Sequence, residues 1–264
     1  MTNDLHGSAT GPHATADGGI EDRLAAEYLR LVELTEAKDH FLTAVSHELR
    51  TPLTSILSST ELLSVLADLE GAPAELVDIV DRNIERMLQL IDGLSLLARL
   101  ESGQLSLEPR LVDLAELVTD GVRRQQSSTV RDIDLTAVPG PPATADPDRL
   151  GLVLDHLLTN ATKHTPAGGR ITVRAEPDET GWVIAIEDTG IGIPAAEQPT
   201  ILDEFARGSN ARQAGIPGAG LGLAISRRIA ELHGGRLTLT SVEGEGTTAT
   251  LRLPFAYADS RLRR

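Results

Sequence analysis

Two long runs of apolar residues at helical spacing constrain the first hundred residues of this chain more than any other feature. In the first run, heptad positions a and d are mostly apolar, which predicts one helix over Glu21–Ala67. The second run predicts a helix that begins at Pro73 and ends near Gly103. Its stripe is formed by Leu76, Ile79, Val80, Asn83, Ile84, Met87, Leu90, Ile91, Leu94 and Leu97.

The two helices predict a hairpin, joined by a turn over residues 68–72. A hairpin with one apolar stripe on each helix cannot bury both stripes well by itself. We therefore expect two copies of the chain to associate, so that their hairpins form a four-helix bundle. The alternative is a hairpin that packs on a second domain of its own chain.

His47 falls on the side of the first helix opposite the apolar seam, so we expect it to face solvent. Glu48 is its neighbour, and Thr51 lies four residues later on the same face. Pro52 removes one backbone hydrogen bond and predicts a bend just after the histidine. The apolar period resumes at Ile56, which favours a helix that continues. Taken alone, His47 would be an ordinary exposed histidine.

Composition limits the classes of protein to which the chain can belong. Its 264 residues indicate two domains, and 41% apolar residues with only 2% aromatic ones indicate aliphatic cores. A net charge of −15 argues against nucleic acid or an anionic membrane as a partner. Cysteine is absent, which excludes disulfides. No apolar run reaches the roughly 20 residues of a membrane helix, so we expect a cytoplasmic chain without direct membrane insertion.

After Pro109 the pattern changes to short helical and strand-like runs. The expected helices are Asp113–Gln126, Asp146–His164 and Gly220–His233, with Asp113 as a cap and Pro147 in a first turn. The expected strands are Asp134–Val138, Arg170–Glu176, Trp182–Asp188, Arg236–Val242 and Thr247–Pro254. This order does not alternate regularly, so it predicts a mixed, largely antiparallel sheet covered by helices on one face.

Two pieces of this second domain carry polar groups in a suggestive pattern. The helix over Leu154–Pro166 places several polar side chains on one face, although a merely solvated face is the alternative. These side chains are His156, Asn160, Lys163 and His164. The string DTGIGIP follows a strand and contains Asp188, Gly190 and Gly192, an arrangement that is ordinarily only a turn.

Two further pieces are rich in glycine. The segment from Gly208 towards Gly218 is too long for a simple turn, so we expect a flexible lid with Phe205 at its base. Arg207 and Arg212 could reach an anion there, although exposed loop arginines are usually only solvated. The string GAGLGLA then enters a helix, whose free amides and dipole attract phosphate. No strand immediately precedes these glycines, so a Rossmann interpretation fails.

The string HELRTP, set in its apolar frame, resembles the phosphoacceptor box of the sensor histidine kinases of two-component systems. The later pieces resemble the N, G1 and G2 boxes and the lid of the same family, in the same order. The resemblance covers about Glu33–Phe255. It implies an α + α/β fold class, in which a HisKA-type dimerisation hairpin precedes a Bergerat-type α/β sandwich that binds ATP.

The resemblance also implies a division of the chain. Residues 1–20 would be a disordered tail, 21–40 a signalling coiled-coil helix and 41–105 the dimerisation and histidine phosphotransfer domain. Residues 110–256 would be the catalytic ATP-binding domain and 257–264 a C-terminal tail. A sensor domain does not fit before His40, so we expect a separate sensor or a larger receptor upstream.

By the same resemblance, His47 accepts a phosphoryl group, Glu48 holds one ring nitrogen, and Thr51 positions water for a phosphatase reaction. Asn160 would bind Mg²⁺, and Asp188 would accept a hydrogen bond from the adenine amino group. The expected nucleotide site comprises His156, Asn160, Lys163, His164, Asp188, Gly190, Gly192, Phe205, Arg207, Gly218, Gly220, Leu221 and Gly222.

The family most often has asparagine at the position of His156, where gyrase and the heat-shock chaperones have a glutamate that activates water. The absence of that glutamate favours transfer to histidine over hydrolysis of ATP. We expect ATP-dependent autophosphorylation of His47 and transfer to the receiver domain of a response regulator. Alternatives are an ATP-binding dimeric scaffold, a net phosphatase of the regulator, and a serine kinase of the anti-sigma type.

Overall fold

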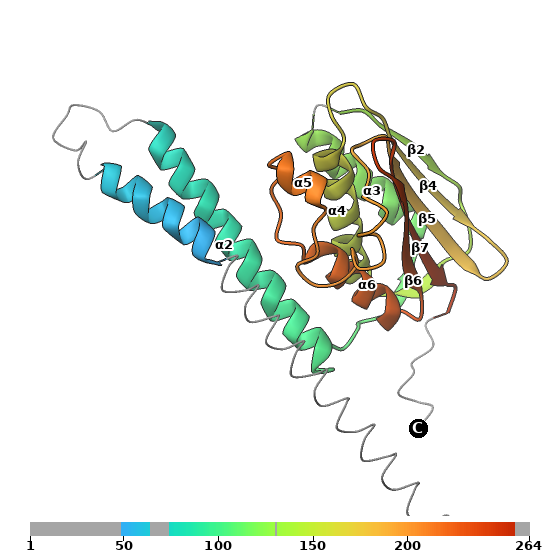
Figure 1. Cartoon of the computed structure of the whole chain (residues 1–264). Helices are drawn as coiled ribbons and strands as arrows, with labels where there is room; N and C mark the ends of the chain where they lie inside the picture. Colours follow the sequence, from blue (N-terminus) through green and yellow to red (C-terminus); the bar gives the residue numbers. More distant parts are fainter. Residues whose placement is uncertain (1–48, 64–73, 130, 257–264) are drawn as a thin grey trace, which may run out of the picture. The chain divides into compact units, whose positions relative to one another are not determined.

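The computed structural model describes residues 49–63, 74–129 and 131–256. The predicted coiled coil over 21–40, the turn over 68–72 and the two predicted tails lie outside the described residues. Within them, one helix spans 49–63 and is followed by helix α2, Ala74–Glu101 (Figure 1). The bounds of α2 confirm the second predicted helix to within about two residues.

The two helices of the hairpin are joined by a polar contact. The Asn83 side-chain amide of α2 donates to Ser55 Oγ, 3.2 Å away, and to the carbonyl of Ile79 at 2.7 Å. Pro52 lies buried within helix 49–63, so the helix continues past the proline as predicted. The bend expected at Pro52 stays a prediction.

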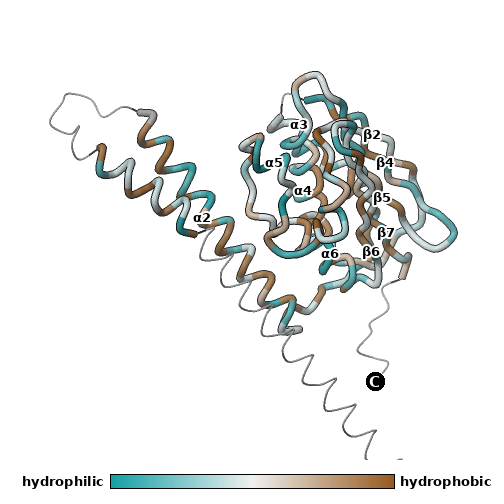
Figure 2. The backbone as a smooth tube through the Cα atoms, viewed as in Figure 1, coloured by the Kyte–Doolittle hydropathy of each residue, from teal (hydrophilic) through white to brown (hydrophobic). Residues whose placement is uncertain are grey.

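Both helices expose large apolar side chains, and Figure 2 shows hydrophobic residues recurring along them. Each of these side chains is between 43% and 57% exposed: Leu53, Leu57, Leu62, Val77, Ile84, Leu88 and Ile91. Several large exposed apolar side chains on neighbouring helices commonly mark a site of association. It supports the expectation that a second copy of the chain covers the hairpin.

The second part of the chain contains two sheets and a set of helices (Figure 1). The larger sheet has the order β2-β4-β5-β7-β6, in which β2 and β4 are parallel and all other neighbours antiparallel. Its strands are β2 Ile133–Ala137, β4 Ile171–Pro177, β5 Gly181–Asp188, β6 Arg236–Val242 and β7 Gly246–Pro254. The mixed, largely antiparallel sheet is therefore confirmed.

Helices α3 (Leu114–Ser128), α4 (Pro147–His164) and α6 (Gly222–Leu232) cover one face of this sheet, as predicted (Figure 1). The strands direct alternate side chains into this layer. On β4, for example, Ile171, Val173 and Ala175 are fully buried. The facing side of α4 is apolar and buries Leu150, Val153, Leu154, Leu157 and Leu158.

Side chains fix the starts of the two longest helices of this domain. Asp113 caps α3, and Asp146 caps α4; each carboxylate accepts hydrogen bonds from the second and third residues after it. Pro147 occupies the first turn of α4, where its missing N–H costs no hydrogen bond. The Asp113 cap and the place of Pro147 confirm the sequence prediction, and each cap satisfies amides that a helix start leaves unpaired.

His233, at the end of α6, is buried and ties this helix to the start of α4. Its Nε2 accepts a hydrogen bond from the Asp146 N–H at 3.0 Å, and its Nδ1 donates to the Ile229 carbonyl at 2.8 Å. The Asp146 carboxylate also accepts from the Glu108 N–H at 2.9 Å. The neutral imidazole therefore has a partner at both nitrogens.

Trp182 on β5 closes the other end of the core. Its indole N–H donates to the Pro141 carbonyl at 2.9 Å, and its ring is 1% exposed. A Cβ on Gly140 would come within 2.9 Å of the ring. Glycine at position 140 therefore allows the chain to cross the indole.

Three short elements differ from the sequence prediction. Strand β1 (Arg110–Val112) lies at the start of the expected catalytic domain, where no strand was predicted, and it pairs with β3 (Ala143–Ala145). Helix α5 (Ser209–Gln213) lies in the segment expected to be a flexible lid. Elements of three to five residues are too short to show a period, which is why the sequence did not predict them. No helix of the described ranges is long and apolar enough to cross a membrane.

The buried position of His233 predicts a pH dependence of stability. Burial lowers the pKa of His233 below its ordinary value of 6.5, while the hydrogen bond to the Ile229 carbonyl and the charge of Asp146 oppose the shift. As the pH falls below 6.5, the unfolded chain takes up a proton that the folded chain resists, so the free energy of unfolding should fall. Burial also lowers the pKa values of His156 and His164, which act in the same direction.

Urea denaturation of the wild type and of His233→Gln at pH 7.5 and 5.5 measures this effect. The variant should be less stable at pH 7.5, because an amide cannot reproduce both imidazole contacts, yet should lose less stability on acidification. Equal losses in the two proteins would show that His233 does not contribute to the pH dependence.

Candidate functional site

The turn over residues 188–194 is held against the C-terminal end of α4. The Ile191 N–H donates to the His164 carbonyl at 3.1 Å. A Cβ on Gly190 would collide with that same carbonyl, so only glycine permits this approach. The turn after β5 and the last turn of α4, 24 residues or more apart in sequence, thus form one surface.

Asp188 ends β5 and is buried at the start of the 188–194 turn. Its Oδ1 accepts the Gly190 N–H at 2.8 Å. Burial raises the pKa of this carboxyl, while hydrogen bonds from the Gly190 and Thr247 amides lower it. A carboxylate in this position can accept a hydrogen bond from an amino group of a bound molecule.

The β6–β7 hairpin supports the other side of the turn. Gly192 has a φ of 62°, and its Cα faces the Val242 carbonyl so closely that a Cβ would collide with it. The Ser241 hydroxyl accepts from the Ile193 N–H at 2.9 Å and donates to the Gly246 carbonyl at 2.8 Å. Gly244 has a φ of 81° within this hairpin turn, a conformation that favours glycine.

The last turn of α4 carries positive charge. Burial lowers the pKa of Lys163. Burial also lowers the pKa of His164, and the nearby charges of Lys163 and Arg207 lower it further. Lys163 and Arg207 thus disfavour a charge on His164, and an anion placed beside these groups would be stabilised. Asn160 lies one turn earlier on the same helix, and no hydrogen bond joins its side chain to any residue that the structure describes.

His156 connects α4 to the start of α6. Its Nδ1 lies 3.3 Å from Ser226 Oγ, and Gly222 lies beside its ring, where an added Cβ would stand 3.4 Å from Cγ. Burial lowers the pKa of His156, and the charge of Asp155 opposes the shift. These contacts are with protein groups, so the nucleotide contact expected for His156 stays a prediction.

The glycines before α6 differ in what they do. Gly220 has a φ of 74°, and a Cβ there would stand 2.6 Å from the Phe205 carbonyl carbon. Phe205 itself has a φ of 59°, which is strained for a residue with a side chain. Gly218 has open space around its Cα, and Leu221 is buried. The segments over 205–206 and 218–222 are therefore in direct backbone contact at Gly220.

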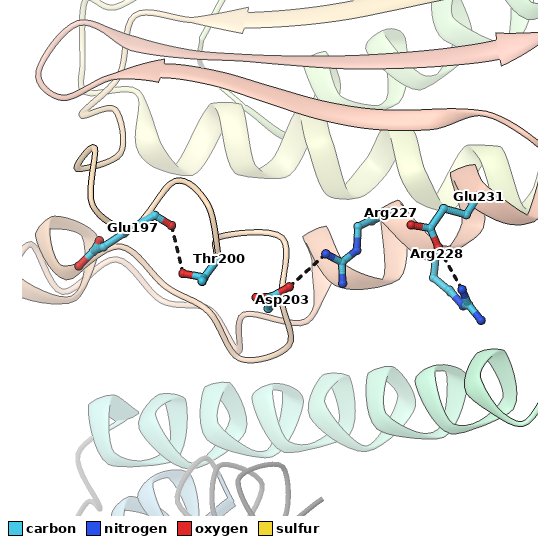
Figure 3. A network of polar contacts seen from close by, with 6 residues as sticks. All are labelled: Glu197, Thr200, Asp203, Arg227, Arg228 and Glu231. Carbon is cyan, nitrogen blue, oxygen red and sulfur yellow. Dashed lines mark hydrogen bonds and ion pairs between the residues drawn. The ribbon is translucent and has the colours of Figure 1, made fainter. Parts of the chain in front are cut away.

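The segment over 201–218 is fastened at several points. Arg207 donates to the Ile216 carbonyl at 2.6 Å, which bridges the segment. Asp203 pairs with Arg227 of α6 at 3.0 Å, and Figure 3 shows this ion pair beside the Arg228–Glu231 pair of the same helix. Both pairs are exposed to solvent, so each contributes only about 0–1 kcal/mol to stability.

Some predicted residues are not brought into this cluster. Arg212 on α5 is exposed and lies near Glu197, whose pKa is lowered by hydrogen bonds from Ser209 and then by Arg212. Thr51 is exposed on helix 49–63. His47 and Glu48 lie outside the described residues.

The sequence patterns did not indicate several residues that hold the site together. Ser241 supports the 188–194 turn, and Gln198 donates to the carbonyls of Ile193 and Ser241. Asn210 of α5 donates to the carbonyls of the same turn. Apart from the bond between Gln198 and Ile193, these contacts join residues at least 18 apart in the chain, so no local pattern could have indicated them.

The cluster combines groups suited to a nucleotide. Asp188 offers a buried acceptor for an amine, the 188–194 turn offers close backbone approach, and the α4 cations with the glycine-rich start of α6 suit phosphates. Among the described residues no group of three or more His, Asp or Glu side chains could hold a metal ion. Asn160 fits Mg²⁺ only if phosphate oxygens supply further ligands.

Comparison with known proteins places two families on this chain. Residues 37–103 match the His Kinase A (phospho-acceptor) domain. Residues 145–257 match the histidine kinase-, DNA gyrase B-, and HSP90-like ATPase. The first match contains His47, and the second contains the nucleotide cluster.

Curated relatives include the sensor protein kinase WalK of Staphylococcus aureus strain MRSA252. It is 35% identical over 231 residues, which cover 84% of this chain and 37% of WalK. A second Staphylococcus aureus WalK sequence is 34% identical and is covered over 55% of its length. The chain thus spans between about a third and about half of the relatives it matches.

Solved structures of histidine kinases share the fold. Full-length ShkA, in complex with AMPPNP, is 27% identical with a TM-score of 0.60, covering 84% of this chain and 47% of ShkA. The Acinetobacter baumannii histidine kinase AdeS is 23% identical with a TM-score of 0.62, covering 79% of this chain and 98% of AdeS. At that identity AdeS supports the fold alone.

The two glycines at 218 and 220 provide a matched test of the described geometry. Gly220→Ala should lower the free energy of unfolding by about 1–3 kcal/mol, because alanine is strained at positive φ and would overlap the Phe205 backbone. Gly218→Ala, which meets open space, should change it by about 0.5 kcal/mol or less. Urea denaturation measures both. A Gly220→Ala variant as stable as Gly218→Ala would contradict this packing.

Proposed function

Since this chain belongs to the sensor histidine kinases of two-component systems, we propose that it uses ATP to phosphorylate its own His47. The phosphoryl group would then pass to an aspartate in the receiver domain of a response regulator. The observation that carries this proposal is the meeting of three distant segments, the end of α4, the β6–β7 hairpin and α5, at the 188–194 turn. A buried acceptor and a group of cations lie in that one cluster.

Recognition of the base rests on Asp188. Its buried carboxylate would accept a hydrogen bond from the adenine amino group. Guanine carries a carbonyl oxygen at the equivalent position and cannot donate there, so the site should prefer ATP to GTP. ATP binding is supported by the ATPase family match and by the AMPPNP complex of ShkA.

Recognition of the phosphates would use Lys163 and the start of α6. The amides at the glycine-rich entrance to α6 can donate to phosphate oxygens, and an anion beside Lys163 would favour its charged form against the burial that lowers its pKa. Asn160 and phosphate oxygens would hold Mg²⁺, which offsets charge on the phosphates when bound. His164, Phe205, Arg207 and Leu221 would line the same site.

The chemical step joins His47 to the γ-phosphoryl group. A neutral ring nitrogen of His47 would attack the γ-phosphorus while the bond to the β–γ bridging oxygen breaks, and ADP leaves with that electron pair. Glu48 would hold the N–H of the other ring nitrogen and accept its proton. The phosphorus–nitrogen bond would then break when an aspartate oxygen of the regulator attacks.

The hairpin would serve dimerisation and the dephosphorylation of the regulator. Its exposed apolar side chains support a homodimer whose hairpins form a four-helix bundle. Thr51, exposed on helix 49–63, would position water for dephosphorylation of the regulator. We also propose that this part of the protein lies in the cytoplasm.

A predominantly phosphatase activity is the second candidate, since the same hairpin would carry it. An ATP-binding scaffold would not need His47, and a serine kinase of the anti-sigma type would not need the hairpin. The match of residues 37–103 to the phospho-acceptor domain argues against the serine kinase.

Incubation with γ-labelled ATP and Mg²⁺ tests the phosphoacceptor. The wild type should gain label that is stable in base and lost in acid, because a phosphorus–nitrogen bond hydrolyses in acid. His47→Gln should gain none while binding ATP with unchanged affinity. Label that persists in His47→Gln would place the phosphoryl group elsewhere, and wild type that binds ATP without label would favour the scaffold or the phosphatase.

Asp188→Asn tests recognition of adenine. Loss of a charge-assisted hydrogen bond should weaken ATP binding about 10- to 100-fold, since such bonds contribute about 1.5–3 kcal/mol. The wild type should prefer ATP to GTP, and the variant should lose most of this preference. Isothermal titration with both nucleotides measures the two effects. Undiminished preference for ATP in a folded variant would exclude Asp188 from base recognition.

A further inference from the structure

Asn210 makes an unusual pair of contacts with the 188–194 turn. Its side-chain Nδ2 donates to the Ile191 carbonyl at 3.2 Å and to the Gly192 carbonyl at 3.0 Å. Asn210 belongs to α5, which lies 18 and 19 residues farther along the chain. One side chain thus joins the short helix of the lid segment to the turn proposed to receive adenine.

Hydrogen bonds at both the oxygen and the nitrogen fix the orientation of this side-chain amide. Its Oδ1 accepts the Ala211 N–H at 2.8 Å, which leaves Nδ2 for the two carbonyls. The Ile191 carbonyl also accepts the Gly244 N–H at 2.9 Å, so the Asn210 bond completes its two acceptor positions. A donor is therefore required at this place, and a group that only accepts would face two carbonyl oxygens.

Helix α5 depends on such contacts for its position. It has five residues, too few to be stable by its own hydrogen bonds. The Glu197 carboxylate accepts the Ser209 N–H at 2.9 Å at its start, and Ala211 is buried beneath it. Asn210 supplies the contact that relates this helix to the 188–194 turn.

We propose that Asn210 is a positioning residue, which holds α5 on the adenine-binding turn so that closure of the 205–218 lid depends on the conformation of that turn. The inference rests on the proposed ATP site. A base that steadies the turn would fix the Ile191 and Gly192 carbonyls and thereby steady α5. Through α5 it would steady the lid, including Arg207, whose bond to Ile216 bridges the same segment.

Asn210→Asp gives the sharpest test, because it keeps the shape of the side chain but replaces the donor with a carboxylate facing two carbonyls. Its ATP affinity should fall about tenfold, which corresponds to the loss of two ordinary hydrogen bonds. Asn210→Ala should show a smaller fall, because water can replace the donor. Gln213→Ala, an exposed change on the same helix, is the matched control and should bind as the wild type does.

Amide hydrogen exchange separates positioning from mere stability. In the wild type, ATP should slow exchange over 205–218. In Asn210→Asp, exchange over 188–194 should be faster without nucleotide, and the slowing of 205–218 by ATP should be largely lost. If Asn210 only stabilised the domain, Asn210→Asp would lower the melting temperature but leave this ATP-dependent slowing intact.

The outcomes distinguish this inference from the proposed function. If the wild type binds ATP and Asn210→Asp shows the same affinity and exchange, the positioning role is wrong and the ATP site stands. If the wild type itself does not bind ATP, the proposed function is wrong, and the lid role fails with it. Should Asn210→Asp not fold, Asn210→Ala carries the same comparison without introducing a charge.

Discussion

The hydrogen bond from the Ile191 amide to the His164 carbonyl is the contact on which the candidate site depends. It joins the end of a helix to the turn after a strand, and it exists only because Gly190 has no side chain to fill the gap. Once these backbones meet, Asp188 stands beside the last turn of α4, with Lys163 and His164 on the neighbouring face. The buried acceptor and these basic groups are thereby brought to one surface.

Burial affects each of the ionisable groups Asp188, Lys163 and His164. Burial raises the pKa of Asp188 and lowers those of His164 and Lys163, so the folded domain makes each of these charges costly. In the proposed site, a ligand that carries an amine at one end and phosphates at the other would relieve both costs. The proposed site would therefore favour such a ligand over either an anion or a base alone.

Much of the secondary structure could be predicted, because the sequence signals for it are local. Asp113 and Asp146 stand immediately before apolar periodic runs, and the structure finds them as caps. The alternation in β4 and β5 likewise predicted strands, although not the parallel pairing of β2 with β4. Gly218 and Gly220 look equivalent in sequence, yet only Gly220 has a positive φ and a backbone against its Cα.

What could not be predicted depends on contacts between distant residues. The bonds of Asn210 and Ser241 exist because the 188–194 turn leaves carbonyls and amides that β-structure does not satisfy. Their partners are fixed by the tertiary fold, and a single polar residue in a loop gives no sign of them. Strands β1 and β3 were missed for a similar reason, since each is defined only by its pairing with the other.

Trp182 has a consequence for spectroscopy. It is the single tryptophan of the chain, it is buried on β5, and its indole N–H is bonded to the Pro141 carbonyl. The intrinsic tryptophan emission of the intact protein therefore originates wholly in the sheet domain and in none of the hairpin helices. Unfolding of that domain can be followed optically in the full chain without an attached dye, while far-ultraviolet dichroism records the helices of both parts together.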